Sequence, residues 1–147
     1  MQCSDGELAT APNHKETHDM AEDHLEVGSL AWTDLTVPDA ESLRDFYAAV
    51  VGWRPEPVSM GEYADFNMVG PESGEPRVGI CHARDSNAYL PPQWLVYVIV
   101  ADLDASLERC RTLGGEIIGE PRRQGESARY CVIRDPAGAV LALYQAR

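Results

Sequence analysis

The strongest constraint on the fold is an internal repeat. The pattern Leu35-x-Val37-x-Asp39 in the first half of the chain matches Val98-x-Val100-x-Asp102 in the second half. Gly52 and Gly114 recur at nearly the same offset, each at the end of a predicted helix. Because the surrounding elements also follow in the same order, we interpret the chain as a duplicated structural unit.

Each half predicts the order strand, helix, strand, strand, strand. Apolar alternation indicates the strands, and apolar residues three and four apart indicate the helices. The first half gives a strand at 30–37, a helix at 39–51 and strands at 53–60, 63–69 and 77–83; the second gives a strand at 94–100, a helix from Asp102 to Leu113 and strands at 116–119, 128–134 and 140–145. The predicted fold class is therefore α+β, with two βαβββ modules.

The domain organisation follows from charge and composition. Residues 1–29 hold seven acidic residues against one lysine, which is half of the net charge of −12, and few large apolar residues. Such a segment buries too little surface to offset chain entropy, so we expect a disordered acidic arm before a domain at 30–146. The modules would be 30–83 and 94–146, joined by a linker at 84–93. Met20 is an alternative start, and the arm histidines (His14, His18 and His24) are not expected to bind metal.

Composition also bears on partners and location. An acidic chain lacks the clustered Lys and Arg that bind phosphate, so we expect no nucleic-acid partner; the doublet Arg122-Arg123 is interpreted as a solvated turn. No apolar run reaches the roughly 20 residues needed to span a bilayer, so no membrane association is expected. The four cysteines form no C-x-x-C pair, which favours reduced thiols and a cytoplasmic location.

The order of short motifs resembles the vicinal oxygen chelate (VOC) superfamily, which includes glyoxalase I, bleomycin-resistance proteins and extradiol dioxygenases. The motifs are Trp32-x-x-Leu35-x-Val37-x-Asp39, Phe46-Tyr47, Val51-Gly52-Trp53, Asp102-x-Asp104-Ala105, Leu113-Gly114-Gly115 and Asp135-Pro136-x-Gly138. The resemblance implies two βαβββ modules whose curved mixed sheets face each other around a central cavity. It also implies a homodimer, although the linker permits a cavity built either within one chain or by module exchange.

In the metal enzymes of this superfamily, ligands come from the first and last strands of each module. The resemblance places these positions at Trp32, Gly79, Leu95 and Ala142. None of these side chains is a usual metal ligand, so we expect no metal and no other cofactor. His82 lies close to Gly79 in sequence, but on the opposite parity of its strand.

Strand alternation then predicts which side chains line the cavity. If Leu35 and Val37 face the helices, their neighbours point inward. The predicted ligand-binding residues are Trp32, Asp34, Thr36, Asp65, Asn67, Tyr97, Arg129 and Tyr144, with Leu95, Ile99, Ala142, Cys81 and Cys131 also on this side. Asp34 is the candidate catalytic base, because burial among aromatic residues would raise its pKa; the alternative is a structural role, through a pair with Arg129 or a hydrogen bond to the backbone.

These features leave three classes of function. The favoured hypothesis is a metal-free glyoxalase-like domain that binds a small, partly aromatic molecule in the cavity. The first alternative is an enzyme of the lyase, isomerase or dioxygenase type, using Asp34 or a nonstandard metal site. The second alternative is a non-catalytic interaction protein, in which Trp32 and Tyr97 fill the cavity.

Overall fold

A computed structural model describes residues 26–147 of the chain. The acidic arm expected at residues 1–29, with Met20 and the three arm histidines, lies almost entirely outside these residues. The described part divides into two compact units, unit 1 (residues 33–94) and unit 2 (residues 26–32 and 95–147). The sequence-based module boundaries remain a prediction.

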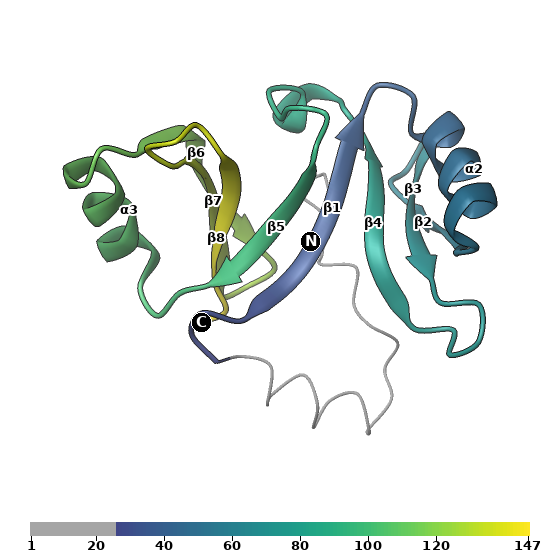
Figure 1. The fold of residues 1–147 in the computed structure, drawn as a ribbon, viewed down its shortest axis with the longest axis horizontal. Helices are drawn as coiled ribbons and strands as arrows, with labels where there is room; N and C mark the ends of the chain where they lie inside the picture. The colour runs from purple at the N-terminus through teal and green to yellow at the C-terminus, as the bar shows by residue number, and fades with distance from the viewer. Residues whose placement is uncertain (1–25) are drawn as a thin grey trace. The chain divides into compact units, whose positions relative to one another are not determined.

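The predicted order of elements is confirmed (Figure 1). In the first half β1 (Leu30–Val37), α2 (Ala40–Val51), β2 (Arg54–Ser59), β3 (Ala64–Val69) and β4 (Pro76–His82) follow one another, and a 3-10 turn, η1 (Asp85–Asn87), comes after them. In the second half the order is β5 (Trp94–Ile99), α3 (Leu103–Thr112), β6 (Glu116–Gln124), β7 (Ala128–Arg134) and β8 (Val140–Gln145).

Both units have the same mixed sheet topology. In unit 1 the strand order is β2-β3-β4-β1, with β1 and β4 parallel and the other pairs antiparallel. In unit 2 the order is β6-β7-β8-β5, with β5 and β8 parallel. The two α-helices of the described residues and these curved mixed sheets confirm the predicted α+β class.

The ends of the two helices show why the repeat is visible in the sequence. Asp39 and Asp102 are the N-caps, and their side chains accept hydrogen bonds from the backbone N–H groups of Ser42 (3.1 Å) and Ala105 (3.0 Å). Gly52 ends α2 with a positive φ of 90°, which is favourable for glycine alone among ordinary residues. These positions recur because each half needs the same start and stop signals.

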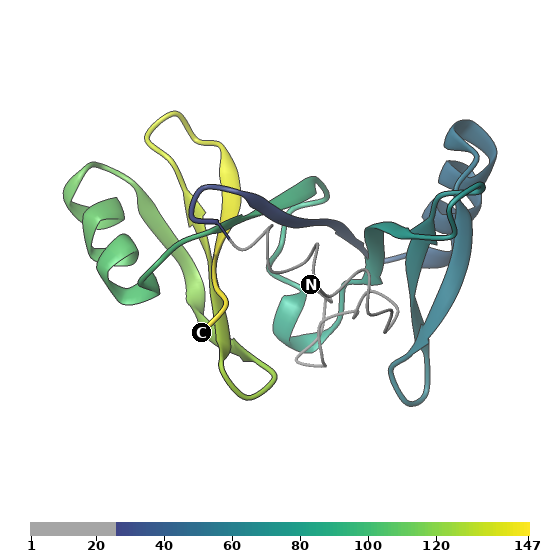
Figure 2. The ribbon, with the colours of Figure 1, turned by 90° about the horizontal axis from the view of Figure 1, so that it is seen from below.

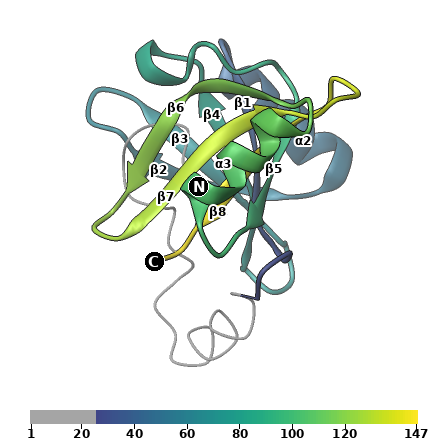
Figure 3. The same cartoon turned by 90° about the vertical axis from the view of Figure 1, so that its left-hand side faces the viewer.

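In each unit, the helix covers one face of the sheet. α2 packs its apolar side on Leu35, Val37, Phe66, Met68 and Ile80 of the unit 1 sheet. The ribbon of Figure 2 shows this helix beside its strands from below. α3 packs Leu103 and Leu107 against Cys131 and Ile133 of the unit 2 sheet. Figure 3 shows α3 in front of the strands of this sheet. The helix-facing role expected for Leu35 and Val37 follows directly from this packing.

The interpretation of Arg122-Arg123 as a solvated turn is wrong. β6 continues through both residues, with Arg122 opposite Tyr130 and Arg123 opposite Arg129 on β7. The pairing register shifts between Ile118 and Arg122, so a bulge around Pro121 accommodates the residue that cannot donate to the ladder.

Candidate functional site

The face of the unit 1 sheet opposite α2 carries polar side chains, and we call it the polar face. Asp34 and Thr36 of β1 alternate with the helix-facing Leu35 and Val37, so they lie on this face. Their exposed fractions are 0% and 4%. Buried polar side chains are uncommon and costly, so the polar face differs from an ordinary core surface.

Register brings the polar residues of three strands into rows. Asp34 of β1 lies opposite Gly79 of β4, and Gly79 in turn lies opposite Asn67 of β3. Gly79 has no side chain, so nothing projects from the sheet between the Asp34 carboxylate and the Asn67 amide. Thr36 lies opposite Cys81 in the next row. The structure therefore brings Asp34, Thr36 and Asn67 together on one sheet, as the sequence predicts.

Some polar atoms on these strands have no hydrogen-bond partner among residues 26–147. They are Thr36 Oγ1, Asp65 Oδ2 and the indole nitrogen of Trp32. Buried polar groups in native proteins nearly always have a partner, in the protein, in ordered water or in a ligand. These atoms are therefore available to water or to a bound molecule.

Asp65 also contacts an imidazole that the sequence analysis did not include in the site. Asp65 Oδ1 accepts a hydrogen bond from the His82 backbone N–H at 2.9 Å and lies 3.2 Å from His82 Nδ1. Burial raises the pKa of the Asp65 carboxyl, while the hydrogen bonds from His82 and its charge oppose that rise. The signal in the sequence was a carboxylate and a histidine on two strands joined by a short turn.

In unit 2 the sheet face opposite α3 is aromatic. Tyr97 lies beside Ala142, and Ile99 beside Tyr144, which is opposite Tyr130. Tyr97 and Tyr130 pack edge to face with ring centroids 5.7 Å apart, and burial raises the pKa of Tyr144. Tyr97 and Tyr144 thus share a face, as expected for cavity-lining residues.

The orientation predicted for Arg129 and Cys131 is wrong. Cys131 packs under α3 in the hydrophobic core, and Arg129 forms a bidentate pair with Asp104 of α3 at 3.0 and 3.1 Å. Tyr130 and Val132 occupy the other face instead. The alternation along β7 was assigned with the wrong parity, because this strand is apolar on both faces. Arg129 therefore has a carboxylate partner on α3 and does not pair with Asp34.

The described cysteines differ in state. Cys110 and Cys131 are free, and burial raises the pKa of the Cys131 thiol, which keeps it protonated and unreactive. Cys81, which we expected to be reduced, is disulfide-bonded.

The positions that bind metal in the resembling enzymes do not fit a metal here. Trp32, Gly79, Leu95 and Ala142 offer an indole N–H, no side chain, an isobutyl group and a methyl group. Divalent metals need imidazole, thiolate or carboxylate donors. Within residues 26–147 no three His, Cys, Asp or Glu side chains are grouped as a metal site requires.

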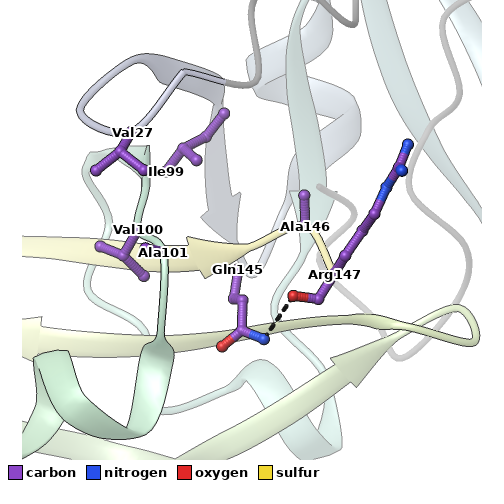
Figure 4. A pocket seen from close by; sticks show the side chains of 7 residues that line it. All are labelled: Val27, Ile99, Val100, Ala101, Gln145, Ala146 and Arg147. Carbon is purple, nitrogen blue, oxygen red and sulfur yellow. Dashed lines mark hydrogen bonds between the residues drawn. The ribbon is translucent and has the colours of Figure 1, made fainter.

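Unit 2 contains a surface pocket that the sequence did not predict (Figure 4). Its volume is about 530 Å³, and it lies where the parallel strands β5 and β8 end. Gln145 is fixed there, because its Oε1 accepts from the Leu103 N–H and its Nε2 donates to the Arg147 carbonyl, both at 2.7 Å. The lining residues are Val27, Ile99, Val100, Ala101, Gln145, Ala146 and Arg147.

Comparison with known proteins places this architecture in a family. A family model described as the Glyoxalase/Bleomycin resistance protein/Dioxygenase superfamily matches residues 29–143. The chain belongs to this superfamily. The VOC resemblance inferred from the short motifs is thereby confirmed.

Individual curated relatives are about 30% identical to the matched part of this chain. The chain is 31% identical over 133 residues to the anthracycline biosynthesis protein DnrV of Streptomyces peucetius, covering 80% of this chain and 47% of that protein. It is 29% identical over 118 residues to the putative glyoxylase CFP32 of Mycobacterium tuberculosis, covering 80% and 44%. The chain thus spans less than half the length of these curated relatives.

A solved structure supports the superfamily fold. A Streptomyces coelicolor methylmalonyl-CoA epimerase variant in complex with 2-nitronate-propionyl-CoA matches with a TM-score of 0.51 at 17% identity, covering 82% of this chain and 98% of that chain. At this identity the likeness shows the fold alone.

Among residues 26–147, neither helix is long and apolar enough to cross a bilayer.

Proposed function

We propose that this glyoxalase-superfamily chain binds a small, partly aromatic molecule on the polar face of unit 1, without a metal ion. The observation that carries the proposal is the set of buried polar atoms without partners in the described part of the chain, above all Thr36 Oγ1, on a face shared with Asp34 and Asn67. A bound molecule that donates to or accepts from these atoms would satisfy them.

The aromatic character of the ligand has one support besides the sequence-based prediction. The superfamily relative DnrV is named as an anthracycline biosynthesis protein. On unit 1 the ligand-binding residues that we retain are Asp34, Thr36, Asp65 and Asn67. The ligand-binding roles of Trp32, Tyr97 and Tyr144, which belong to unit 2, stay sequence-based predictions.

Daunorubicin, an anthracycline with its own fluorescence, is a direct probe of this proposal. We expect saturable quenching of its fluorescence by the purified protein. The variant Thr36→Val keeps the side-chain shape but removes the hydroxyl. Loss of one hydrogen bond of about 1 kcal/mol should weaken the affinity for daunorubicin about fivefold. Arg129→Ala is the matched control, because Arg129 lies on the helix side of its sheet, and this variant should bind daunorubicin as tightly as the wild type does.

Two outcomes would count against the proposal. Absence of saturable binding would exclude this aromatic ligand class, and equal affinities of the Thr36→Val variant and the wild type would remove the polar face from the site.

An enzymatic role is the second candidate, favoured by the complete burial of the Asp34 carboxylate. In this role Asp34 would take a proton from the bound molecule, as expected for a lyase or isomerase. The variant Asp34→Asn would then no longer convert the bound molecule, although daunorubicin would still bind to the variant. Turnover that persists in this variant would exclude Asp34 as the base.

The remaining sequence-based predictions extend the proposal. Homodimer formation is supported by the VOC resemblance, and sedimentation of the purified chain would show whether two copies associate. The cytoplasmic location stays a prediction, and the disulfide-bonded Cys81 removes part of its support, because that prediction used reduced thiols.

A further inference from the structure

The Asp65–His82 pair in unit 1 is an acid–base arrangement whose histidine the proposed function does not use. An ionised carboxylate can only accept, so the contact of 3.2 Å between Asp65 Oδ1 and His82 Nδ1 places the imidazole proton on Nδ1. The lone pair of the neutral ring is then on Nε2. Among residues 26–147, Nε2 of His82 has no hydrogen-bond partner, and 16% of the side chain is exposed.

The backbone of His82 is held on both sides. Its N–H donates to Asp65 Oδ1 at 2.9 Å, and its carbonyl accepts from Asn87 Nδ2 at 3.1 Å. Asn87 is itself buried, and its Oδ1 accepts from the Arg84 N–H at 2.6 Å. The turn that follows β4 is therefore fixed, and the imidazole is preorganised for a role that requires one orientation.

Arg84 adds a positive charge to the same cluster. The Tyr63 ring packs edge to face with the His82 ring at 5.4 Å between centroids, and the Arg84 guanidinium lies 4.1 Å from the centroid of the Tyr63 ring. The Arg84 guanidinium thus adds a positive charge beside Tyr63, and its charge also acts on Asp65.

The electrostatics of the cluster support a proton-transfer role. Burial raises the pKa of Tyr63, and the Asp65 charge adds to that rise while Arg84 opposes it. Asp39, at the N-cap of α2, also interacts with the His82 charge, and Asp85 interacts with Tyr63. The ionisable groups that interact with His82 are thus Asp39, Tyr63 and Asp65, while Arg84 and Asp85 act on Tyr63.

We propose that Asp65 and His82 form an acid–base dyad in which His82 Nε2 accepts a proton from a weakly acidic small molecule, while Arg84 stabilises the negative charge that develops. His82 is the catalytic residue, and Asp65 is a positioning residue that fixes the tautomer and balances the imidazolium. The dyad shares Asp65 with the proposed ligand-binding residues, but its base, His82, is not one of them. A His82-dependent reaction rate and the binding of daunorubicin are therefore separate outcomes.

A test of this dyad needs a probe that only a base converts, and 5-nitrobenzisoxazole is suitable. Nε2 takes the proton of the ring C–H bond, and the electron pair of that bond completes a nitrile. The N–O bond breaks with its electrons on oxygen, so the product is 2-cyano-4-nitrophenolate, whose absorbance is followed. No other reactant is needed.

We expect the wild-type protein to accelerate this reaction above the rate in buffer, and His82→Gln to return it to the buffer rate. Removal of a general base typically costs a factor of about 10² to 10⁴. Glu116→Gln, at an exposed position of β6 in unit 2, is the control, because it introduces the same residue into the other unit, and it should keep the full rate.

The role of Asp65 is measured through the separate values of kcat and KM for the nitrobenzisoxazole. In Asp65→Asn the imidazole loses the carboxylate that holds its proton on Nδ1, so kcat should fall while KM stays near the wild-type value, a split that general destabilisation of the fold would not cause. Arg84→Gln should also lower kcat.

Chemical modification gives a second measurement if His82→Gln does not fold. Diethyl pyrocarbonate transfers a carbethoxy group to a neutral imidazole nitrogen, and peptide mass mapping identifies the modified histidine. We expect the rate to fall in proportion to modification at His82 and to recover with hydroxylamine. A wild-type rate equal to that in buffer, or a rate unchanged when His82 is carbethoxylated, would overturn the proposal.

Discussion

At the scale of single residues, Asp65 combines burial with a partner that favours its charge. Desolvation is the largest influence on its pKa and raises it, while the His82 hydrogen bonds lower it. Because the folded-state pKa of Asp65 is raised, the unfolded chain releases this proton at a lower pH than the folded chain does. The free energy of unfolding therefore falls as the pH rises from the unfolded pKa of Asp65 to its folded pKa.

The variant Asp65→Asn tests this sign. Below the unfolded pKa of about 4, both proteins carry a neutral side chain at this position. As the pH rises through the folded pKa of Asp65, the wild-type free energy of unfolding should fall relative to that of Asp65→Asn. Urea denaturation of both proteins across this pH range measures the difference, and a wild-type advantage that grows with pH would contradict it.

Residue orientation was predictable where strand alternation is strict. On β1, the apolar Leu35 and Val37 alternate with the polar Asp34 and Thr36, so one helix-facing assignment determined all four. On β7, Cys131 lies between the equally apolar Tyr130 and Val132. Alternation gives no parity there, and only the tertiary structure placed Arg129 beside Asp104.

At the scale of elements, α3 shows how position decides the contribution of a leucine. Leu107 is 3% exposed and packs on the unit 2 sheet, whereas Leu113, directly after the helix, is 76% exposed. We expect Leu107→Ala to lower the free energy of unfolding by about 2–5 kcal/mol, because it leaves a cavity in the core. Leu113→Ala is the matched control and should change it by less than about 0.5 kcal/mol in the same urea titration.

The start of α3 gives an independent prediction. Asp102 accepts the Ala105 N–H at 3.0 Å, so Asp102→Ala removes the partner of an otherwise unpaired amide. The expected cost is about 1 kcal/mol, measured by urea denaturation. Asp102→Asn keeps an N-cap acceptor and should stay close to the wild type; equal destabilisation of the two variants would show that the cap hydrogen bond is not the cause.

The element boundaries were predicted well where caps and glycines punctuate the chain, and poorly where a bulge intervenes. Gly52 and the two capping aspartates mark helix ends through local hydrogen bonds. The continuation of β6 beyond Pro121 depends on pairing with β7, a contact between distant residues that local composition does not encode.

At the scale of the whole molecule, the donor set predicts metal content. The four superfamily ligand positions carry no imidazole, thiolate or carboxylate. We expect protein purified without chelators to contain far less than one equivalent of zinc, nickel, iron or manganese by mass spectrometry. Stoichiometric metal that survives dialysis would overturn the metal-free proposal.

The sequence by itself determined the repeated βαβββ order, the helix-facing residues of β1 and the mismatch at the metal positions. These features depend on local signals, namely alternation, capping and residue chemistry. Only the tertiary structure decided the contact between Asp65 and His82, the helix-side place of Arg129 and the pocket beside Gln145. Each of these requires side chains from separate elements to meet, and register and packing set that geometry rather than any local pattern.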